Sequence, residues 1–146
     1  MRVAIASDHG GFIQKQPLIE YMQSKGLDVV DLGPDSDERC DYPDYAFKVA
    51  DMVSSGQADR GVLICGTGLG MGMSADKVAG IRAAAIQTPE FSELFRAHNN
   101  GNVICLSGRF VTLGTNQEIL DKFFDTDFEG GRHVVRVEKM MSADTK

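Results

Sequence analysis

The sequence has no apolar run that approaches the ~20 residues needed to cross a membrane. Its first eight residues contain neither a long apolar core nor a small-residue cleavage site. They therefore predict a first strand and not a secretion signal. We expect a cytoplasmic protein with no membrane segment.

Cysteine is also scarce, and its spacing is not that of a metal site. The chain has 3 cysteines, an odd number, and no C-x-x-C pair that would indicate zinc or a redox dithiol. We therefore expect no metal site. Basic residues are fewer than acidic ones, and the net charge is -6. This argues against a nucleic-acid partner. An anionic small substrate remains compatible, because a few local arginines can outweigh the overall sign.

What is present is typical of one globular domain over residues 1–146, with 42% hydrophobic and 25% charged residues. Short apolar runs predict strands over 2–6, 28–31, 60–65, 81–86 and 103–107. Helical spacing and helix-ending residues predict helices over 14–25, 43–54, 90–98, 113–124 and 133–141, with a frayed end from 142. This alternation predicts an α/β fold, a doubly wound, Rossmann-like, five-stranded parallel sheet with helices on both faces.

The two turns richest in reactive groups follow the first and third of these strands. Ligands of such sheets bind beyond the carboxyl ends of the strands, where the strand order reverses. In a flavodoxin-like order this point lies between strands one and three. Those strands lead into S-D-H-G-G (7–11) and C-G-T-G-L-G (65–70). Fold and chemistry therefore predict one crevice between them.

The second of these turns is rich in glycine and begins at Cys65. Glycines let backbone N–H groups converge on an anion. The turn lacks the last glycine of a dinucleotide G-x-G-x-x-G motif, and it has no phosphate-binding G-x-x-x-x-G-K-[ST] match. Cys65 is either a small buried apolar residue or a thiolate favoured by those N–H groups. Cys105, inside a strand, fits the buried description better, and Cys40 lies in a polar loop.

Other candidate groups have ordinary structural explanations too. His9 follows Asp8, a pair that often only caps a helix. His98 precedes N-N-G, a typical helix end where a histidine is comfortable. Arg132 and Arg136 share a helix face and could clamp a phosphate, although spacing alone favours a solvated cationic face.

Taken together, these segments resemble the ribose-5-phosphate isomerase B family, which includes the galactose-6-phosphate isomerase subunits. The matching stretches are A-S-D-H-G-G (6–11), D-Y-P-D (41–44), C-G-T-G-L-G-M (65–71), G-I-R-A-A (80–84), H-N-N-G-N-V (98–103), G-R (108–109) and F-E-G-G-R-H (128–133). They span nearly the whole chain in the family's order and spacing.

The resemblance implies a role for each matching residue. Cys65 would be the base that moves a proton between C1 and C2 of the sugar, and His98 would open the sugar ring. The anion hole would comprise Gly66, Thr67, Gly68, Leu69 and Gly70. Asp8, His9 and Asn99 would contact the substrate, and Arg109, Arg132 and Arg136 would hold its phosphate. In this family a homodimer, possibly within a dimer of dimers, shares each site, with His98 and Asn99 supplied by the partner subunit.

These roles agree with the chemistry of isomerisation. Removing a proton next to a carbonyl builds an enediolate, and preorganised N–H donors stabilise its oxygen charge, each by on the order of 10²–10³ in rate. A positioned base adds roughly 10²–10⁴. The reaction is redox-neutral, so no cofactor is required. The phosphate would anchor the far end of the substrate.

The sequence departs from the family pattern in places. Residues 86–88 are I-Q-T where many members have Cys-His-Asp, and Gly72 and Asp76 replace the common Ser and Asn. If the fourth-strand loop lines the sugar pocket, the substrate could be ribose 5-phosphate, galactose 6-phosphate, allose 6-phosphate or a tetrulose phosphate. A different class is a regulatory module that binds a phosphate or nucleotide, which would need neither Cys65 nor His98. A degenerate structural subunit would be expected to lack one of them.

Overall fold

The computed structural model describes residues 1–145. The strands are β1 (Arg2–Ser7), β2 (Asp28–Asp31), β3 (Arg60–Cys65), β4 (Ala83–Ala85) and β5 (Val103–Ser107). The helices are α1 (Phe12–Ser24), α2 (Tyr42–Ser54), α3 (Leu69–Ala75), α4 (Pro89–Asn99), α5 (Leu113–Asp125) and α6 (His133–Met141), followed by the 3₁₀ helix η1 (Ser142–Thr145).

The five strands form one parallel sheet in the order β2-β1-β3-β5-β4. This confirms the predicted α/β class and the reversal of strand order between β1 and β3. The last two strands are exchanged relative to a flavodoxin-like order. β4 is shorter than predicted because the Arg82 N–H donates to the side-chain oxygen of Asn102 (2.8 Å) and not to a neighbouring strand.

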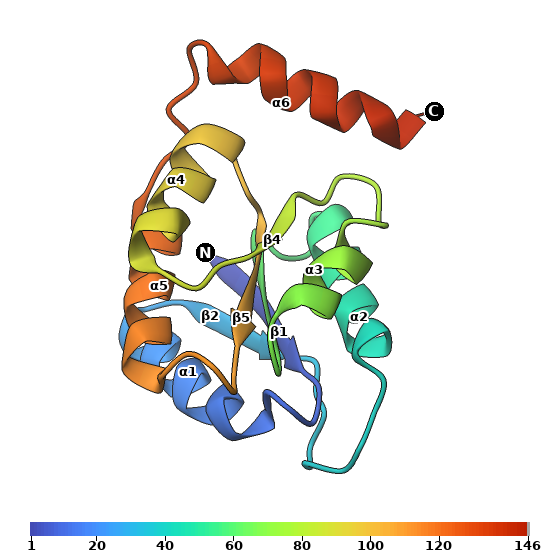
Figure 1. The fold of residues 1–146 in the computed structure, drawn as a ribbon, viewed down its shortest axis with the longest axis vertical. Coiled ribbons are helices and arrows are strands. Elements are labelled where there is room, and N and C mark those ends of the chain that lie inside the picture. Colours follow the sequence, from blue (N-terminus) through green and yellow to red (C-terminus); the bar gives the residue numbers. More distant parts are fainter. Residues whose placement is uncertain (146) are drawn as a thin grey trace.

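Each face of the sheet is buried under helices, which is why the strands are continuously apolar (Figure 1). On one face Val3 and Ile5 of β1 pack with α1, α4 and α5. On the other face Ala4 and Ala6 pack with α2 and α3. Cys65 belongs to this second layer. Alternate residues of a strand point to opposite faces, so one short strand supplies both cores.

Two local structures differ from the sequence prediction. The segment over 69–75 forms α3 although it contains two glycines, because it follows Gly68, whose left-handed backbone (φ 85°) turns the chain directly into a helix. Residues 142–145 form η1, and the Asp144 carboxylate accepts the Gly80 N–H at 2.8 Å. This segment is therefore held against the body, and only Lys146 of the predicted frayed end lies outside the described residues.

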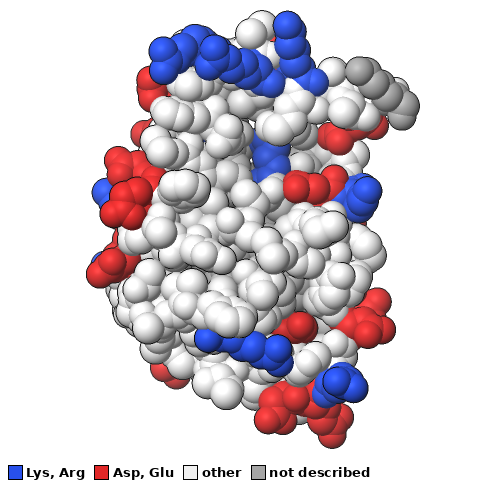
Figure 2. Space-filling model, viewed as in Figure 1, with Lys and Arg blue, Asp and Glu red and all other residues white. Residues whose placement is uncertain are grey.

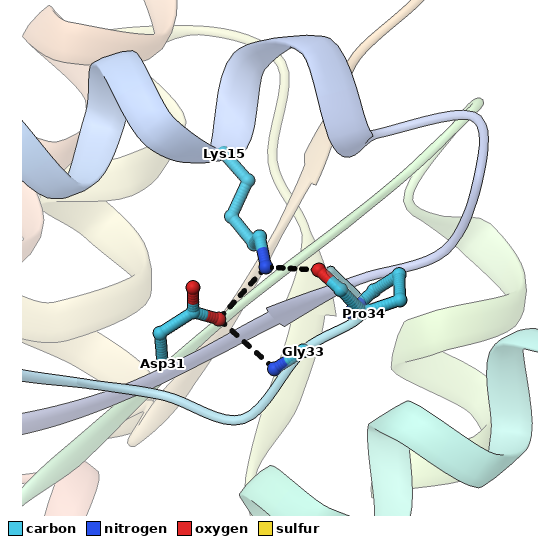
Figure 3. A network of polar contacts seen from close by, with 4 residues as sticks. All are labelled: Lys15, Asp31, Gly33 and Pro34. Atoms are coloured by element: carbon cyan, nitrogen blue, oxygen red, sulfur yellow. Dashed lines mark hydrogen bonds and ion pairs between the residues drawn. The ribbon is translucent and has the colours of Figure 1, made fainter. Parts of the chain in front are cut away.

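A buried lysine fixes the loop that follows β2. The Lys15 side chain on α1 is 4% exposed, and its Nζ donates to Asp31 Oδ1 (2.8 Å) and to the Pro34 carbonyl (2.6 Å) (Figure 3). The Gly33 N–H donates to the same Asp31 oxygen at 2.9 Å. These contacts satisfy a charge that would be costly to bury alone. They also fix the start of the loop that leads to Cys40.

Because the strands are parallel, their carboxyl ends lie at one edge of the sheet and their amino ends at the opposite edge. β1, β3 and β5 all end at one edge, which we call the carboxyl edge (Figure 1). The helices return antiparallel to the strands, so α4 ends at the opposite, amino edge, beside the start of α6 (Figure 1). No helix within residues 1–145 is long and apolar enough to cross a bilayer.

Candidate active site

The turn after β1 is closed by its own aspartate. Asp8 Oδ1 accepts the N–H groups of Gly10 (2.8 Å) and Gly11 (3.1 Å), and the Asp8 N–H donates to the Ile64 carbonyl (3.1 Å). The residue is only 7% exposed. Asp8 therefore shapes the β1 turn through backbone bonds and ties it to the end of β3.

Cys65 ends β3 with its sulfur under a backbone donor. The Gly68 N–H donates to Cys65 Sγ at 3.0 Å. Only glycine fits at residue 68, because φ is 85° and a Cβ there would lie 3.1 Å from the Cys105 carbonyl oxygen. Thr67 Oγ1 accepts the Leu69 N–H at 3.2 Å. An N–H aimed at the sulfur stabilises negative charge on it, as a base would need.

The turn after β5 packs directly on the Cys65 turn. The Gly108 N–H donates to the Cys65 carbonyl (2.8 Å), and the Arg109 N–H donates to the Gly66 carbonyl (3.2 Å). Ser107 Oγ donates to that same Gly66 oxygen at 2.7 Å. The Arg109 guanidinium lies over Gly66, with Nη1 3.3 Å from where a Cβ would stand. The structure thus places Arg109 beside Cys65.

His9 and Arg109 line one open pocket of about 490 Å³ between α1 and the β5 turn. His9 Nδ1 accepts the Cys40 N–H at 3.3 Å, so a neutral His9 carries its proton on Nε2. A cation and a histidine in one pocket suit an anionic group such as a phosphate.

The other two thiols lack these features. Cys105 is fully buried, and burial raises the pKa of its thiol well above the ordinary value, so this thiol stays protonated. Burial also raises the pKa of Cys40. The sequence expectation that Cys105 is a packing residue agrees with its place in the core.

A second group of side chains gathers at the amino edge. The rings of His98 and His133 are stacked with centroids 4.3 Å apart, and His98 Nε2 lies 3.7 Å from a Glu129 carboxylate oxygen. His133 is 5% exposed, and its Nε2 has no hydrogen-bond partner within the described chain. Burial lowers the pKa of His133, and nearby His98 acts in the same direction.

This cluster includes two residues that sequence reasoning did not single out. Each of His98, Glu129 and His133 offers a ligand atom within 4.8 Å of the others, a set that could hold a divalent ion. The parallel rings would have to tilt to point both lone pairs at one ion. Glu129 and His133 both lie in the F-E-G-G-R-H segment. Their contact with His98 could not be predicted, because His98 is distant from them in the sequence. Tyr42, whose ring lies against Gly70, was also missed.

The remaining predicted residues lie at this amino edge as well. Asn99 lines a pocket of about 390 Å³ beneath α6. Arg132 at the N-cap of α6 and Arg136 within α6 are both exposed, and neither forms an ion pair within residues 1–145. Figure 2 shows a basic band over α6 and a second basic group at the other end of the molecule.

The predicted site residues thus form two groups on opposite edges of one sheet. His98 precedes β5 and Arg109 follows it. The five residues of β5, at about 3.3 Å each, separate the two groups by roughly 17 Å. The carboxyl-edge group contains Asp8, His9, Cys65, residues 66–70 and Arg109. The amino-edge group contains His98, Asn99, Glu129, Arg132, His133 and Arg136. Within one chain, His98 cannot reach Cys65.

Residues 86–88, where the chain departs from the family pattern, follow β4 at the carboxyl edge. Ile86 is 5% exposed in the core, and Thr88 Oγ1 caps α4 by accepting the Phe91 N–H at 3.2 Å. Gln87 between them is exposed. β5 separates β4 from β3, so these residues do not adjoin the end of β3 directly.

A thiol beneath an N–H donor at the strand-order reversal of a doubly wound α/β fold, next to a cationic pocket, suits proton transfer on an anionic substrate. The family model of ribose/galactose isomerases matches residues 3–140, and the chain belongs to this family. It is 48% identical to a probable ribose-5-phosphate isomerase B of Mycoplasma genitalium, over 95% of this chain and 93% of that one. It is 41% identical to ribose-5-phosphate isomerase B of Escherichia coli, over 99% and 97%.

Solved structures give the same result. Ribose-5-phosphate isomerase B of Clostridium thermocellum superposes with a TM-score of 0.97 and 41% identity, covering 99% of this chain and 98% of that one. The enzyme of Mycoplasma genitalium with bound ribulose-5-phosphate has a TM-score of 0.96 and 46% identity, covering 99% and 97%.

Proposed function

We propose that residues 1–146 act as one isomerase domain that interconverts ribose 5-phosphate and ribulose 5-phosphate, with Cys65 as the base. The observation that carries this proposal is the Cys65 sulfur 3.0 Å from the Gly68 nitrogen, at the end of β3 where the strand order reverses. A relative of the same fold has been solved with ribulose-5-phosphate bound. Three free cysteines fit a reducing compartment, and we propose a cytoplasmic location.

In the proposed reaction the Cys65 thiolate removes the proton from C2 of the open-chain aldose. The C2–H electrons form the C1–C2 double bond, and the C1 carbonyl oxygen becomes the enediolate oxygen. Backbone N–H groups of residues 66–70 stabilise that oxygen. Cys65 then returns the proton to C1, while a proton moves from O2 to O1. The ketose forms with no net oxidation, so the reaction consumes no redox cofactor.

The phosphate and the ring need the other residues. His9 and Arg109 share the cationic pocket beside Cys65 and would bind the phosphate with Arg132 and Arg136. His98, with Asn99 beside it, would open the furanose ring by protonating the ring oxygen as the C1 hydroxyl loses its proton. Anchoring the phosphate fixes C1 and C2 against Cys65.

We further propose a homodimer, alone or within a dimer of dimers, in which each complete site combines the carboxyl edge of one chain with the amino edge of the other. The separation of roughly 17 Å supports this assembly, because neither group reaches the other within one chain. A two-fold axis would create two equivalent shared sites.

The test is turnover of a panel of aldose phosphates of four to six carbons, with ribose 5-phosphate expected to give the highest kcat/KM. A higher value for galactose 6-phosphate or allose 6-phosphate would support the isomerase activity but show that ribose 5-phosphate is not the preferred substrate. Stabilisation by nucleotides in a thermal-shift screen, without turnover of any sugar phosphate, would favour the regulatory module. Activity should survive EDTA, because the N–H groups polarise the carbonyl. Loss that a divalent ion restores would instead assign the His98, Glu129 and His133 cluster to a metal.

A further inference from the structure

Two amide side chains meet between α1 and α5, just behind the pocket that Arg109 lines. Asn116 on α5 is completely buried, and its Nδ2 donates to Gln14 Oε1 on α1 at 2.7 Å. The same Nδ2 donates to the Ser107 carbonyl at 3.0 Å. Gln14 Nε2 donates to the carbonyls of Gly108 (3.1 Å) and Val111 (2.9 Å). We call these two residues the amide pair.

The amide pair holds the whole turn over 107–111 from behind. Its amide groups donate three hydrogen bonds, to the carbonyls of residues 107, 108 and 111, which lie on both sides of Arg109. The front of the turn is bonded to the catalytic strand, through the Arg109 N–H and Ser107 Oγ to the Gly66 carbonyl. The position of the Arg109 backbone is therefore set between the amide pair and the Cys65 turn.

The hydrogen bonding of the pair argues against two simpler roles. The Gln14 amide lines the pocket, but its nitrogen and oxygen both bond within the protein, so it is not a free ligand for substrate. Asn116 Oδ1 is buried with no partner among the described residues. An unpaired buried oxygen costs stability that an apolar side chain of similar size would avoid. Packing alone therefore does not account for an asparagine here.

We propose that Gln14 and Asn116 are positioning residues that hold Arg109 in the geometry that binds the substrate phosphate. The inference rests on the proposed phosphate role of Arg109. Gly108 packs tightly against the β1 turn, since a Cβ there would lie 2.8 Å from the Gly10 carbonyl oxygen. The turn is thus fitted closely in front and held by two side-chain amides behind.

The test is a double-mutant cycle between Gln14→Met and Arg109→Ala, with ribose 5-phosphate as substrate. Methionine keeps the length of the side chain and removes both N–H donors. Gln14→Met should raise KM about tenfold with kcat within about twofold, because phosphate binding weakens while the base is untouched. In the Arg109→Ala background the same change should raise KM by less than about twofold. Equal factors in both backgrounds would overturn the inference.

Two further measurements separate positioning from general loosening. Ser92→Ala removes a buried bond to α5, from Ser92 Oγ to the Ile119 carbonyl (2.7 Å), without touching the turn, so KM should not change. Amide hydrogen exchange at residues 108–110 should accelerate in Gln14→Met and stay unchanged in Ser92→Ala. A KM increase of similar size in Ser92→Ala would contradict the proposal. If Gln14→Met does not fold, Asn116→Ala replaces it in the cycle, with the same expected pattern.

A binding readout keeps this test apart from that of the proposed function. The Kd for inorganic phosphate should rise about tenfold in Gln14→Met and show the same non-additivity with Arg109→Ala. If the wild type fails to isomerise ribose 5-phosphate, the substrate assignment is wrong, yet the phosphate cycle still decides the role of the amide pair. Additive Kd changes would overturn that role.

Discussion

At the carboxyl edge, Cys65 and Arg109 are placed by backbone hydrogen bonds between three turns that follow neighbouring strands. At the amino edge, His98 sits near a helix end, and Arg132 and Arg136 project from α6 with no ionic partner in residues 1–145. Its side-chain contacts are the ring stack and the 3.7 Å approach of His98 Nε2 to Glu129, and one backbone bond joins the Glu129 N–H to the Ala97 carbonyl (2.9 Å). The first group is fixed by the turns of the sheet, whereas the two arginines of the second group are exposed.

This difference suits two different tasks. A proton transfer on carbon requires the base and the N–H donors to be in place before the substrate arrives. Backbone contacts hold them there, so no reorganisation is needed during the reaction. In the proposed mechanism a phosphate clamp and a ring-opening acid would tolerate looser placement, because the substrate and a partner subunit would complete them. Four experiments test this comparison, from the largest expected effect to the smallest.

The first removes the base. Cys65→Ala should lower kcat by at least about 10³, because the proton-transfer group is lost while the backbone turn remains. Circular dichroism and thermal unfolding should show an intact fold, and iodoacetamide should inactivate the wild type unless substrate protects it. Cys105→Ala is the matched control at a buried thiol. Retention of a tenth of the wild-type kcat in Cys65→Ala would show that another group is the base.

The second experiment mixes two inactive variants, Cys65→Ala and His98→Ala. A hybrid dimer pairs an intact Cys65 from one chain with an intact His98 from the other in one of its two sites. At equal random mixing about half the dimers are hybrids, so roughly a quarter of the wild-type activity is the ceiling. The assay uses a cyclic aldose phosphate, and native mass spectrometry verifies the hybrids. No recovery in verified hybrids would contradict shared sites.

The third tests the exposed arginines on α6. Arg132→Ala and Arg136→Ala should each raise KM roughly 10- to 100-fold, because each removes a charge-assisted contact to the phosphate. The fall in kcat should be smaller, since the phosphate is remote from the reacting carbons. Lys122→Ala, another exposed cation, is the control. Unchanged kinetics in both variants would show that the two arginines form only a solvated cationic face and do not bind the phosphate.

The fourth concerns the pH response of the amino-edge group. The pKa of His133 is lowered in the folded protein, so the unfolded chain binds more protons near pH 6, and stability falls as the pH drops through this range. Between pH 7.5 and 5, Tm should fall less in His133→Gln than in the wild type. The two proteins should differ by at most about one proton taken up on unfolding. Measured Tm values that fall equally in both proteins would exclude a contribution from His133.

Much of the fold could be predicted because local signals agree with the tertiary structure. Three of the five strands have the predicted bounds, and the ends of the predicted helices differ by at most two residues. The order of β4 and β5 could not be predicted, because nothing local to either strand specifies which one β3 pairs with. α3 was missed because its glycines indicate a loop, and its position depends on the left-handed Gly68.

The candidate site divides in the same way. Cys65, its glycine turn and Arg109 follow strands, and a parallel sheet brings such positions together. His98 and Arg136 follow no such rule, and only the resemblance to a family connected them with Cys65. Gln14 and Asn116 were not predicted, since two amides separated by 102 residues have no sequence signature.

The two outer strands limit how copies of this chain can associate. β2 and β4 have four and three residues, and β2 begins and ends with an aspartate. Such short outer strands, one of them ending in charges on both sides, are poor templates for adding a strand from another molecule. Self-association by sheet extension is therefore disfavoured, and contact through helical surfaces is left as the main route. Exposed apolar side chains on α3, α4 and α6, among them Leu69, Phe91 and Val135, offer such surfaces.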